Sequence, residues 1–565
     1  MLLHVQLDGS ERVIALTEFE ERVRDGTLGP ETPVRSEPLT GDRWVPAGDL
    51  EIFRGIRASP EVRVRQALAS AAVPWFTALL VGVEFRIFFW TQYTPVQAWL
   101  WDRFTKYTPA IVEGDQHWRL LSYGFLHGDA GHIGMNMLLI AYLGIALESV
   151  IGAFSLAVLF TSSVFWGGVL SALLAPDSPS VGASGGDFGF LAAAAVFGLR
   201  YGNMLPPRAR SRFGVIMLIY LIYFFISSLL APKVDNWGHL GGLLAGGAHM
   251  ALLRPNVGPV WVRRNRMISF IVLLLGFVGV VGMAGLAIPL VPVEEDGLTA
   301  ERPVWWTEGW AATGDRAWIS PVDGGQLVAR TLHHEGPSTL ADATADLLAS
   351  FREVDAGAVV TTEGDVTEDG VAGRSLHLTY TNAGRARRVD AVVYVRGAYE
   401  SRLVLDVPEG QGRVALLWPR LVEGFALTVP ADVAKARAAT GGWRGRLHQA
   451  EGAAQLGDVA GARALIDTAL REAPGEPAPR LALLDLLADY PDPTAASQAD
   501  AALLAWPTDR KVLEAAVRAL VAAGQPDLAR ARLDARIAAA PEDRKLLRLR
   551  DALFADAVTP PAPPP

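Results

Sequence analysis

The sequence has no cysteine among its 565 residues, and this absence excludes several kinds of chemistry. Disulfide bonds, cysteine-ligated zinc sites and thiol nucleophiles all require that side chain. The sequence also lacks an excess of basic residues, because 51 Lys and Arg stand against 60 Asp and Glu, giving a net charge of −9. Nucleic-acid binding calls for a basic face. We therefore expect no nucleic-acid partner.

The sequence is rich in apolar residues. Hydrophobic residues make up 50% of the chain and the mean hydropathy is +0.24, which is too apolar for an ordinary soluble enzyme. A helix that crosses a bilayer needs about 20 mostly apolar residues. The runs that reach or approach this length are 72–91, 132–149, 152–175, 184–200, 213–231, 236–253 and 267–291. They predict a polytopic α-helical membrane protein with seven spanning helices.

The arginines between these runs predict how the chain is oriented in the membrane. They cluster after the fourth and sixth runs, whereas the loop 231–235 holds only Lys233. Positively charged loops remain in the cytoplasm. We therefore predict a cell inner-membrane protein of bacterial type, with a cytoplasmic N-terminus and extracytoplasmic domains after residue 291. The clustered arginines are Arg200, Arg208, Arg210, Arg212, Arg254, Arg263, Arg264 and Arg266.

Two soluble α+β domains flank the apolar region. Residues 1–65 mix short strands with one helix and resemble the small GYF-related modules found beside bacterial membrane proteins. Residues 297–430 alternate apolar and polar positions, as in "SLHLTYTNAGRARRVDAVVYVRG", which predicts an antiparallel meander with one helix near 338–353. This second domain shows no catalytic cluster, and we expect His333 and His334 to lie on its surface.

The C-terminal region 436–555 is helical and repetitive. "LGDVAGARALIDTALREAP" aligns with "AGQPDLARARLDARIAAAP", and the prolines Pro474, Pro507 and Pro541 recur at spacings of 33 and 34 residues. This period resembles that of tetratricopeptide repeats, which implies that the array binds protein partners. An unspecialised helical bundle is the alternative. Residues 556–565 form a Pro-rich tail.

Two polar residues open apolar runs at matching positions. Ser184 begins the fourth run, and His239 lies in the first turn of the sixth. One helix separates these runs, so both run in the same direction and the two side chains lie at similar depth. Small residues beside them let helices approach closely in lipid. The glycines concerned are Gly185, Gly238, Gly241, Gly242 and Gly246. A serine next to an imidazole base is the pairing that nucleophilic catalysis requires.

A second polar pair lies at the start of the second run. His132 and Asn136 are four residues apart and therefore share one helix face. We expect both to donate hydrogen bonds to a developing oxyanion, together with the Ser184 backbone N–H at a helix start.

Together these motifs resemble the rhomboid intramembrane serine proteases. The matching residues are Gly-Ala-Ser-Gly at 182–185, "NWGHLGG" around His239, His127 with His132 and Asn136, Trp118-Arg119, and the Gly-x3-Glu-x3-Gly pattern in "YLGIALESVIG". The resemblance covers the membrane domain 66–292. It implies a six-helix core with a seventh helix, and a Ser-His dyad without an acidic third member. It also implies transmembrane protein substrates in the lipid bilayer, cleaved near the outer surface without a metal or cofactor.

Some residues in this region admit other interpretations. Arg119 and Glu148 are expected to be structural, and Phe188 is expected to pack on His239. Asp187 occupies a position that is usually apolar in the family, and it is either a structural group or a third catalytic member. We favour the structural role. No pattern accounts for Glu84 and Arg86.

The alternative to a protease is a non-proteolytic rhomboid-like scaffold that binds membrane clients. Loss of Ser184 or His239 would have indicated it, but both residues are present. A transporter is disfavoured, because the sequence shows no inverted repeat with paired broken helices.

Overall fold

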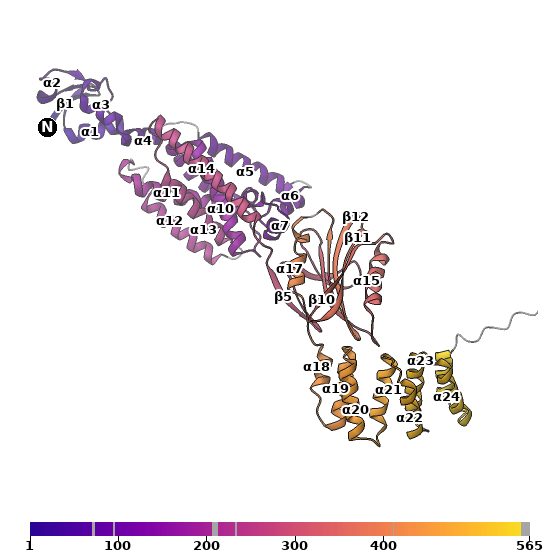
Figure 1. Ribbon diagram of the computed structural model, residues 1–565. Coiled ribbons are helices and arrows are strands. Elements are labelled where there is room, and N and C mark those ends of the chain that lie inside the picture. Colours follow the sequence, from indigo (N-terminus) through magenta and orange to yellow (C-terminus); the bar gives the residue numbers. More distant parts are fainter. Residues whose placement is uncertain (70–73, 94–95, 206–212, 232–233, 411, 555–565) are drawn as a thin grey trace, which may run out of the picture. The chain divides into compact units, whose positions relative to one another are not determined.

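The computed structural model describes the chain except for residues 70–73, 94–95, 206–212, 232–233, 411 and 555–565. The Pro-rich tail, Lys233 and three of the clustered arginines (Arg208, Arg210 and Arg212) lie outside the described residues. The chain divides into two compact units, Met1–Ala287 and Ile288–Pro565 (Figure 1).

The first unit begins with a small α+β fold. Its four-stranded sheet has the order β2-β1-β3-β4, formed by Ser10–Ala15, Leu2–Leu7, Pro33–Arg35 and Val45–Pro46. The sequence predicted one helix here, whereas the structure has three: α1 (Leu16–Asp25), α2 (Glu37–Thr40) and α3 (Glu51–Ala58). Leu3, Val5 and Phe19 are fully buried in its core. Helix α4 (Pro60–Ala69) follows, and Arg65 on it pairs with Asp25 at 2.6 Å.

Each of the seven predicted apolar runs contains a helix, but the run 267–291 is not helical throughout, because its helix ends at Ala284 and a strand begins at Leu290. The runs form α5 (Trp75–Tyr93), α9 (Ala130–Ile151), α10 (Ala153–Leu174), α11 (Ser184–Tyr201), α12 (Val215–Leu230), α13 (Asn236–Leu252) and α14 (Pro259–Ala284). Helices α9, α10 and α14 are long and apolar enough to cross a membrane by length and composition alone. Helix α12 is apolar but has only 16 residues. Helices α5, α11 and α13 carry the charged, histidine and glycine residues that lower hydropathy.

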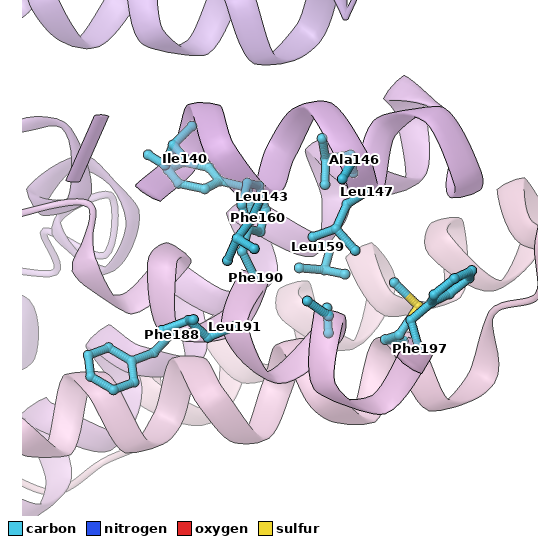
Figure 2. Packing of buried hydrophobic residues seen from close by; sticks show 14 of the residues in the cluster. Ile140, Leu143, Ala146, Leu147, Leu159, Phe160, Phe188, Phe190, Leu191 and Phe197 are labelled. Carbon is cyan, nitrogen blue, oxygen red and sulfur yellow. The ribbon is translucent and has the colours of Figure 1, made fainter. Parts of the chain in front are cut away.

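The main apolar core of the helical bundle is shared by α9, α10 and α11. Ile140, Leu143 and Leu147 on α9 pack with Leu159 and Phe160 on α10 and with Phe190 and Leu191 on α11 (Figure 2). Short helices connect α5 to α9: α6 (Gln97–Phe104), α7 (Thr108–Val112), α8 (Arg119–Ser122) and the 3-10 turn η2 (Tyr123–Phe125). This connection packs on α10 through Ile111 and Leu120, so it is part of the folded bundle.

The second unit contains an antiparallel sheet of seven strands in the order β10-β11-β12-β13-β9-β8-β7. The expected meander is present as β10 (Val359–Glu368), β11 (Val371–Asn382), β12 (Arg385–Arg396) and β13 (Tyr399–Pro408). The remaining strands are β9 (Gln326–His333), β8 (Arg316–Ile319) and β7 (Thr307–Trp310). The expected helix is α15 (Leu340–Val354), and its Leu347 and Phe351 are buried against the sheet.

A smaller sheet accompanies the large one. It has the order β14-β6-β5, formed by Ala426–Leu427, Leu298–Pro303 and Leu290–Glu295. Helices α16 (Gly412–Ala415) and α17 (Trp418–Glu423) precede β14. His333 is exposed as expected, and half-buried His334 contacts Glu400 at 3.0 Å.

The chain continues as an array of helices. These are α18 (Ala431–Arg437), α19 (Gly442–Gln455), α20 (Val459–Glu472), α21 (Pro477–Asp489), α22 (Ala495–Ala505), α23 (Arg510–Ala522), α24 (Pro526–Ala539) and α25 (Arg544–Phe554). The aligned glycines Gly457 and Gly524 have φ of 77° and 73° and turn the chain between α19 and α20 and between α23 and α24. Left-handed φ values of this kind suit glycine at a helix end.

Candidate active site

Ser184 and His239 meet at the ends of two neighbouring helices. Ser184 is the first residue of α11, and His239 lies in the first turn of α13. The His239 Nε2 atom is 2.8 Å from the Ser184 Oγ atom, which is hydrogen-bond distance. The imidazole is 7% exposed. The structure thus brings together the two residues that the sequence proposed as nucleophile and base.

Glycines allow this approach, because they let the α11 and α13 backbones touch. A Cβ atom added at Gly242 would lie 2.0 Å from the Gly185 carbonyl oxygen, and one at Gly246 would lie 2.5 Å from Gly189 Cα. On another face of α13, a Cβ at Gly241 would lie 2.6 Å from the Trp166 carbonyl oxygen of α10. No larger residue fits these positions without moving a helix.

The His239 ring is held by stacking. The Phe188 ring lies on it with centroids 4.3 Å apart and an interplanar angle of 22°, as the sequence predicted. For Nε2 to accept the serine proton, the ring proton must lie on Nδ1. The buried Nδ1 atom has no hydrogen-bond partner within the described part of the chain. The arrangement therefore joins Ser184, His239 and a stacked aromatic ring, with no third polar group bonded to the imidazole among the described residues.

Asp235 is a supporting residue that the sequence interpretation missed. Its carboxylate caps α13 by accepting from the Gly238 N–H at 2.9 Å, and it accepts from Ser171 Oγ at 2.6 Å. The cap fixes where α13 begins and so where His239 lies. An Asp just before a helix start is a recognisable capping signal in "VDNWGH".

His132 is oriented as a hydrogen-bond donor toward the segment that leads to Ser184. The Gly128 N–H donates to His132 Nδ1 at 3.4 Å, so the ring proton lies on Nε2. A Cβ atom at Gly182 would lie 2.6 Å from that Nε2 and 3.7 Å from Asn136 Nδ2. Both predicted oxyanion donors therefore face the backbone at Gly182, two residues before Ser184.

His127, which the sequence placed with His132 and Asn136 in the family motif, also belongs to this cluster. It precedes α9, so the face of that helix does not constrain it. Its Nε2 atom lies 3.0 Å from Asn136 Nδ2 and accepts from the Ala183 N–H at 3.5 Å. Its ring is fully buried, 5.0 Å from the His132 ring.

The loop before Ser184 is tied to the α5–α9 connection. Lys106 and Ser180 exchange backbone hydrogen bonds of 3.0 and 3.1 Å, and the Lys106 ammonium donates to the Ser178 carbonyl at 2.5 Å. Burial lowers the pKa of Lys106 to about 8. The Gly182 N–H donates to the Tyr123 carbonyl at 3.0 Å. These bonds fix the backbone that presents the serine.

Arg119 and Glu148 have the structural roles expected of them. Glu148 accepts from the Phe76 and Thr77 N–H groups at 3.0 and 2.9 Å and from the Thr77 hydroxyl at 2.7 Å. It thereby caps α5. Arg119 donates to Gln116 and to the Thr105 carbonyl, each at 2.8 Å.

The charged residues of α5 and α11 separate into buried and exposed groups. Asp187 and Glu84 are 3% and 0% exposed, and no hydrogen bond joins Asp187 to His239 within the described residues. Arg86 faces outward with its guanidinium 5.4 Å from the Trp90 ring centroid. In the part of the chain that the structure describes, no cluster of His, Asp and Glu has the arrangement of a metal site.

Comparison with known proteins shows what the helical bundle is similar to. Residues 114–256 match the model of the Rhomboid domain. RHOMBOID-like protein 4 of Arabidopsis thaliana is 34% identical over 161 residues, which are 27% of this chain and 39% of that protein. Rhomboid protease GluP of Bacillus subtilis is 27% identical over 227 residues, which are 39% of this chain and 43% of that protein. These matches support the rhomboid family for the helical bundle.

The chain spans less than half the length of these two relatives. Among solved structures, cyanobacterial PsbP from Synechocystis is similar over 26% of this chain and 95% of its own, with 15% identity and a TM-score of 0.22. A likeness at that score carries no argument.

Proposed function

We propose that this membrane protein with a Rhomboid domain is an intramembrane serine endopeptidase that cleaves transmembrane helices of other proteins. The observation that carries the proposal is the 2.8 Å separation of Ser184 Oγ and His239 Nε2 at the ends of two apolar helices. A serine hydroxyl becomes a nucleophile when a neighbouring base takes its proton. His239 is buried in the bundle and Ser184 is half-buried, which suits a reaction within the membrane.

The proposed reaction is acyl transfer. Ser184 attacks the peptide carbonyl while His239 accepts the serine proton and later returns it to the leaving amine. The oxyanion accepts hydrogen bonds from His132 Nε2–H, the Asn136 amide and the Ser184 backbone N–H. Water then takes the place of the leaving amine, and the same steps in reverse order release the acyl group and restore Ser184. These steps use water and groups of the chain itself, namely side chains and one backbone N–H.

We expect substrates whose helices unwind readily near the extracytoplasmic surface of the membrane. A helical carbonyl is already hydrogen-bonded, so it must be released before a nucleophile can reach it. Small or helix-breaking residues lower the cost of that release. The lipid bilayer is therefore part of the binding environment, and the substrates are transmembrane proteins.

The proposed topology places the 1–65 module, which is GYF-like in sequence, in the cytoplasm and the second unit outside an inner membrane of bacterial type. It rests on the arginine-rich loops after α11 and α13. The tetratricopeptide-like helices α19–α25 would then bind protein partners outside the cytoplasm. A reporter fused after residue 300 should behave as extracytoplasmic, and cytoplasmic behaviour would contradict the topology.

The competing function is a scaffold that binds membrane proteins without cutting them. The bonded Ser184 and His239 pair favours the protease, because a scaffold has no use for it. The test is cleavage of a fluorogenic transmembrane substrate in proteoliposomes. Wild type should cleave it, and Ser184→Ala and His239→Ala should each abolish cleavage while the protein remains folded. Turnover that persists in either folded variant would rule out the dyad.

A further inference from the structure

A groove of about 480 Å³ lies within the second unit, where one end of the large sheet meets helices α19 and α21. One side is formed by residues 333–337 and Ala398, and the other by side chains of α19, α20 and α21. Its volume falls in the range of ligand-binding pockets, roughly 300–1,000 Å³.

Backbone contacts fix the two sides relative to one another. The Ala398 N–H donates to the Gln455 carbonyl at 2.8 Å, and the His334 N–H donates to the Ala398 carbonyl at 2.9 Å. A Cβ atom added at Gly397 would lie 2.3 Å from the Gln455 carbonyl oxygen. The turn between β12 and β13 therefore packs directly on the end of α19, and the groove is a built feature of this unit.

The groove combines apolar and acidic side chains, and its basic lining residues are the histidines His333, His334 and His448. Its apolar lining includes Ala450, Ala454, Ile466, Leu481 and Leu486. Four carboxylates line it as well, and among the described residues that line it none is Lys or Arg. The carboxylates are Glu335, Glu451, Asp485 and Asp489.

Two of these carboxylates lie one turn apart on α21. Asp485 pairs with Arg518 at 2.7 Å, whereas Asp489 has no ion pair within the described residues. Burial raises the pKa of both groups, and the charge of Asp485 raises the pKa of Asp489 further. A cation in the groove would relieve this repulsion.

We propose that the groove binds a peptide segment of a partner protein in which Lys or Arg side chains alternate with apolar residues. The basic side chains pair with the carboxylates, and the apolar ones cover Ala450, Ala454 and Leu481. This proposal concerns binding by the second unit and does not depend on the protease activity.

The test uses the full chain with Ser184→Ala, in nanodiscs of neutral phosphatidylcholine, so that neither cleavage nor anionic lipid interferes. The probe is a rhodamine-labelled nonapeptide, Gly-Lys-Leu-Lys-Ala-Lys-Leu-Lys-Gly, followed by fluorescence anisotropy. A second peptide carries Glu in place of Lys. The groove variant is Asp485→Asn with Asp489→Asn. The matched control is Asp534→Asn with Glu542→Gln, which removes the same charge from exposed positions outside the groove.

We expect the Lys peptide to bind and the Glu peptide not to bind. The groove variant should bind the Lys peptide at least about fivefold more weakly, and the control should match wild type. Added salt should weaken binding. The proposal is overturned if the Lys peptide does not bind, if both peptides bind equally, or if the groove variant keeps full affinity.

A second and independent inference concerns Glu84 on α5. His127 Nε2 faces the backbone N–H of Ala183 at 3.5 Å, and a backbone N–H can only donate. Nε2 is therefore the acceptor and the ring proton lies on Nδ1. That buried Nδ1 atom faces Glu84 Oε2 at 3.7 Å, and neither Glu84 oxygen has a hydrogen-bond partner in the described part of the chain.

We infer that Glu84 is a positioning residue that holds His127 in its Nδ1–H form. In that form His127 Nε2 accepts from the Asn136 amide group at 3.0 Å, which fixes the amide with its nitrogen on this side. The second N–H of the Asn136 amide is then left for the oxyanion. This inference rests on the proposed function, because it assigns Glu84 a part in orienting an oxyanion donor.

The experiment compares Glu84→Gln, which keeps an acceptor oxygen, with Glu84→Leu, which does not. Arg86→Leu is the control on the same helix. We expect Glu84→Leu to lower kcat about tenfold or more with KM unchanged, because oxyanion stabilisation acts in the transition state. Glu84→Gln and Arg86→Leu should stay close to wild type. Equal loss in the Gln and Leu variants, or full kcat in folded Glu84→Leu, would overturn the inference.

A readout without catalysis separates this inference from the proposed function. NMR of isotope-labelled histidine reports which ring nitrogen carries the proton. His127 should be Nδ1-protonated in wild type and in Glu84→Gln, and should lose that preference in Glu84→Leu. Nε2 protonation in wild type would refute the role of Glu84 whether or not the protein cleaves a substrate.

Discussion

Replacing Gly242 by alanine tests whether close helix packing sets the geometry of the site. The added Cβ atom would lie 2.0 Å from the Gly185 carbonyl oxygen, 1.4 Å short of the 3.4 Å at which ordinary contact begins. Backbone cannot rotate away as a flexible side chain can, so α11 and α13 must separate. Gly185 directly follows Ser184, and the shift therefore lengthens the 2.8 Å contact with His239. A misplacement of about 1 Å costs about 10²-fold in rate.

The assay is kcat for a fluorogenic transmembrane substrate in proteoliposomes, with thermal unfolding measured in the same detergent for each variant. Gly247→Ala is the matched control on the same helix, because its Cβ would meet Ala192 Cβ at an ordinary 3.5 Å. We expect Gly242→Ala to lose about 10²-fold in kcat and Gly247→Ala to stay near wild type. If folded Gly242→Ala keeps kcat within about threefold, close packing does not control the dyad.

Three further predictions concern neighbouring residues. Asn136→Ala should lower kcat about 10²-fold, the usual cost of one oxyanion donor, and an unchanged kcat would assign Asn136 to helix packing. Asp187→Asn should keep kcat within about tenfold, because Asp187 makes no bond to His239 within the described residues; a loss as large as that of His239→Ala would make it a third catalytic member. Lys106 has a pKa of about 8 in the folded chain against 10.5 ordinarily, so the unfolded chain binds more protons between these values. The free energy of unfolding should therefore rise from pH 8 to pH 10.5, and Lys106→Met should remove that rise, as measured by denaturant titration; an equal rise in both proteins would contradict it.

The sequence predicted the parts of the site that depend on local pattern and helix order. Apolar runs located the seven helices, and the matching positions of Ser184 and His239 on parallel helices predicted that they meet. Both follow from the period of one helix or the direction of two. The stacked Phe188 ring was instead implied by the resemblance to the rhomboid family.

The remaining features depend on contacts that no local pattern contains. His127 lies before α9, so counting residues from His132 could not place it. Glu84 approaches His127 only because α5 packs beside α9. The groove in the second unit joins residues more than one hundred positions apart, on a strand end and three helices. Asp235 was the exception, since its capping position could be read from the sequence.

The central claim is that Ser184 is a nucleophile activated by His239. Labelling of the purified protein with a fluorescent fluorophosphonate probe tests it without a known substrate. We predict that wild type is labelled on Ser184, that Ser184→Ala is not labelled, and that folded His239→Ala is labelled at least about 10²-fold more slowly. An unlabelled wild type, or equal labelling of wild type and Ser184→Ala, would contradict the claim.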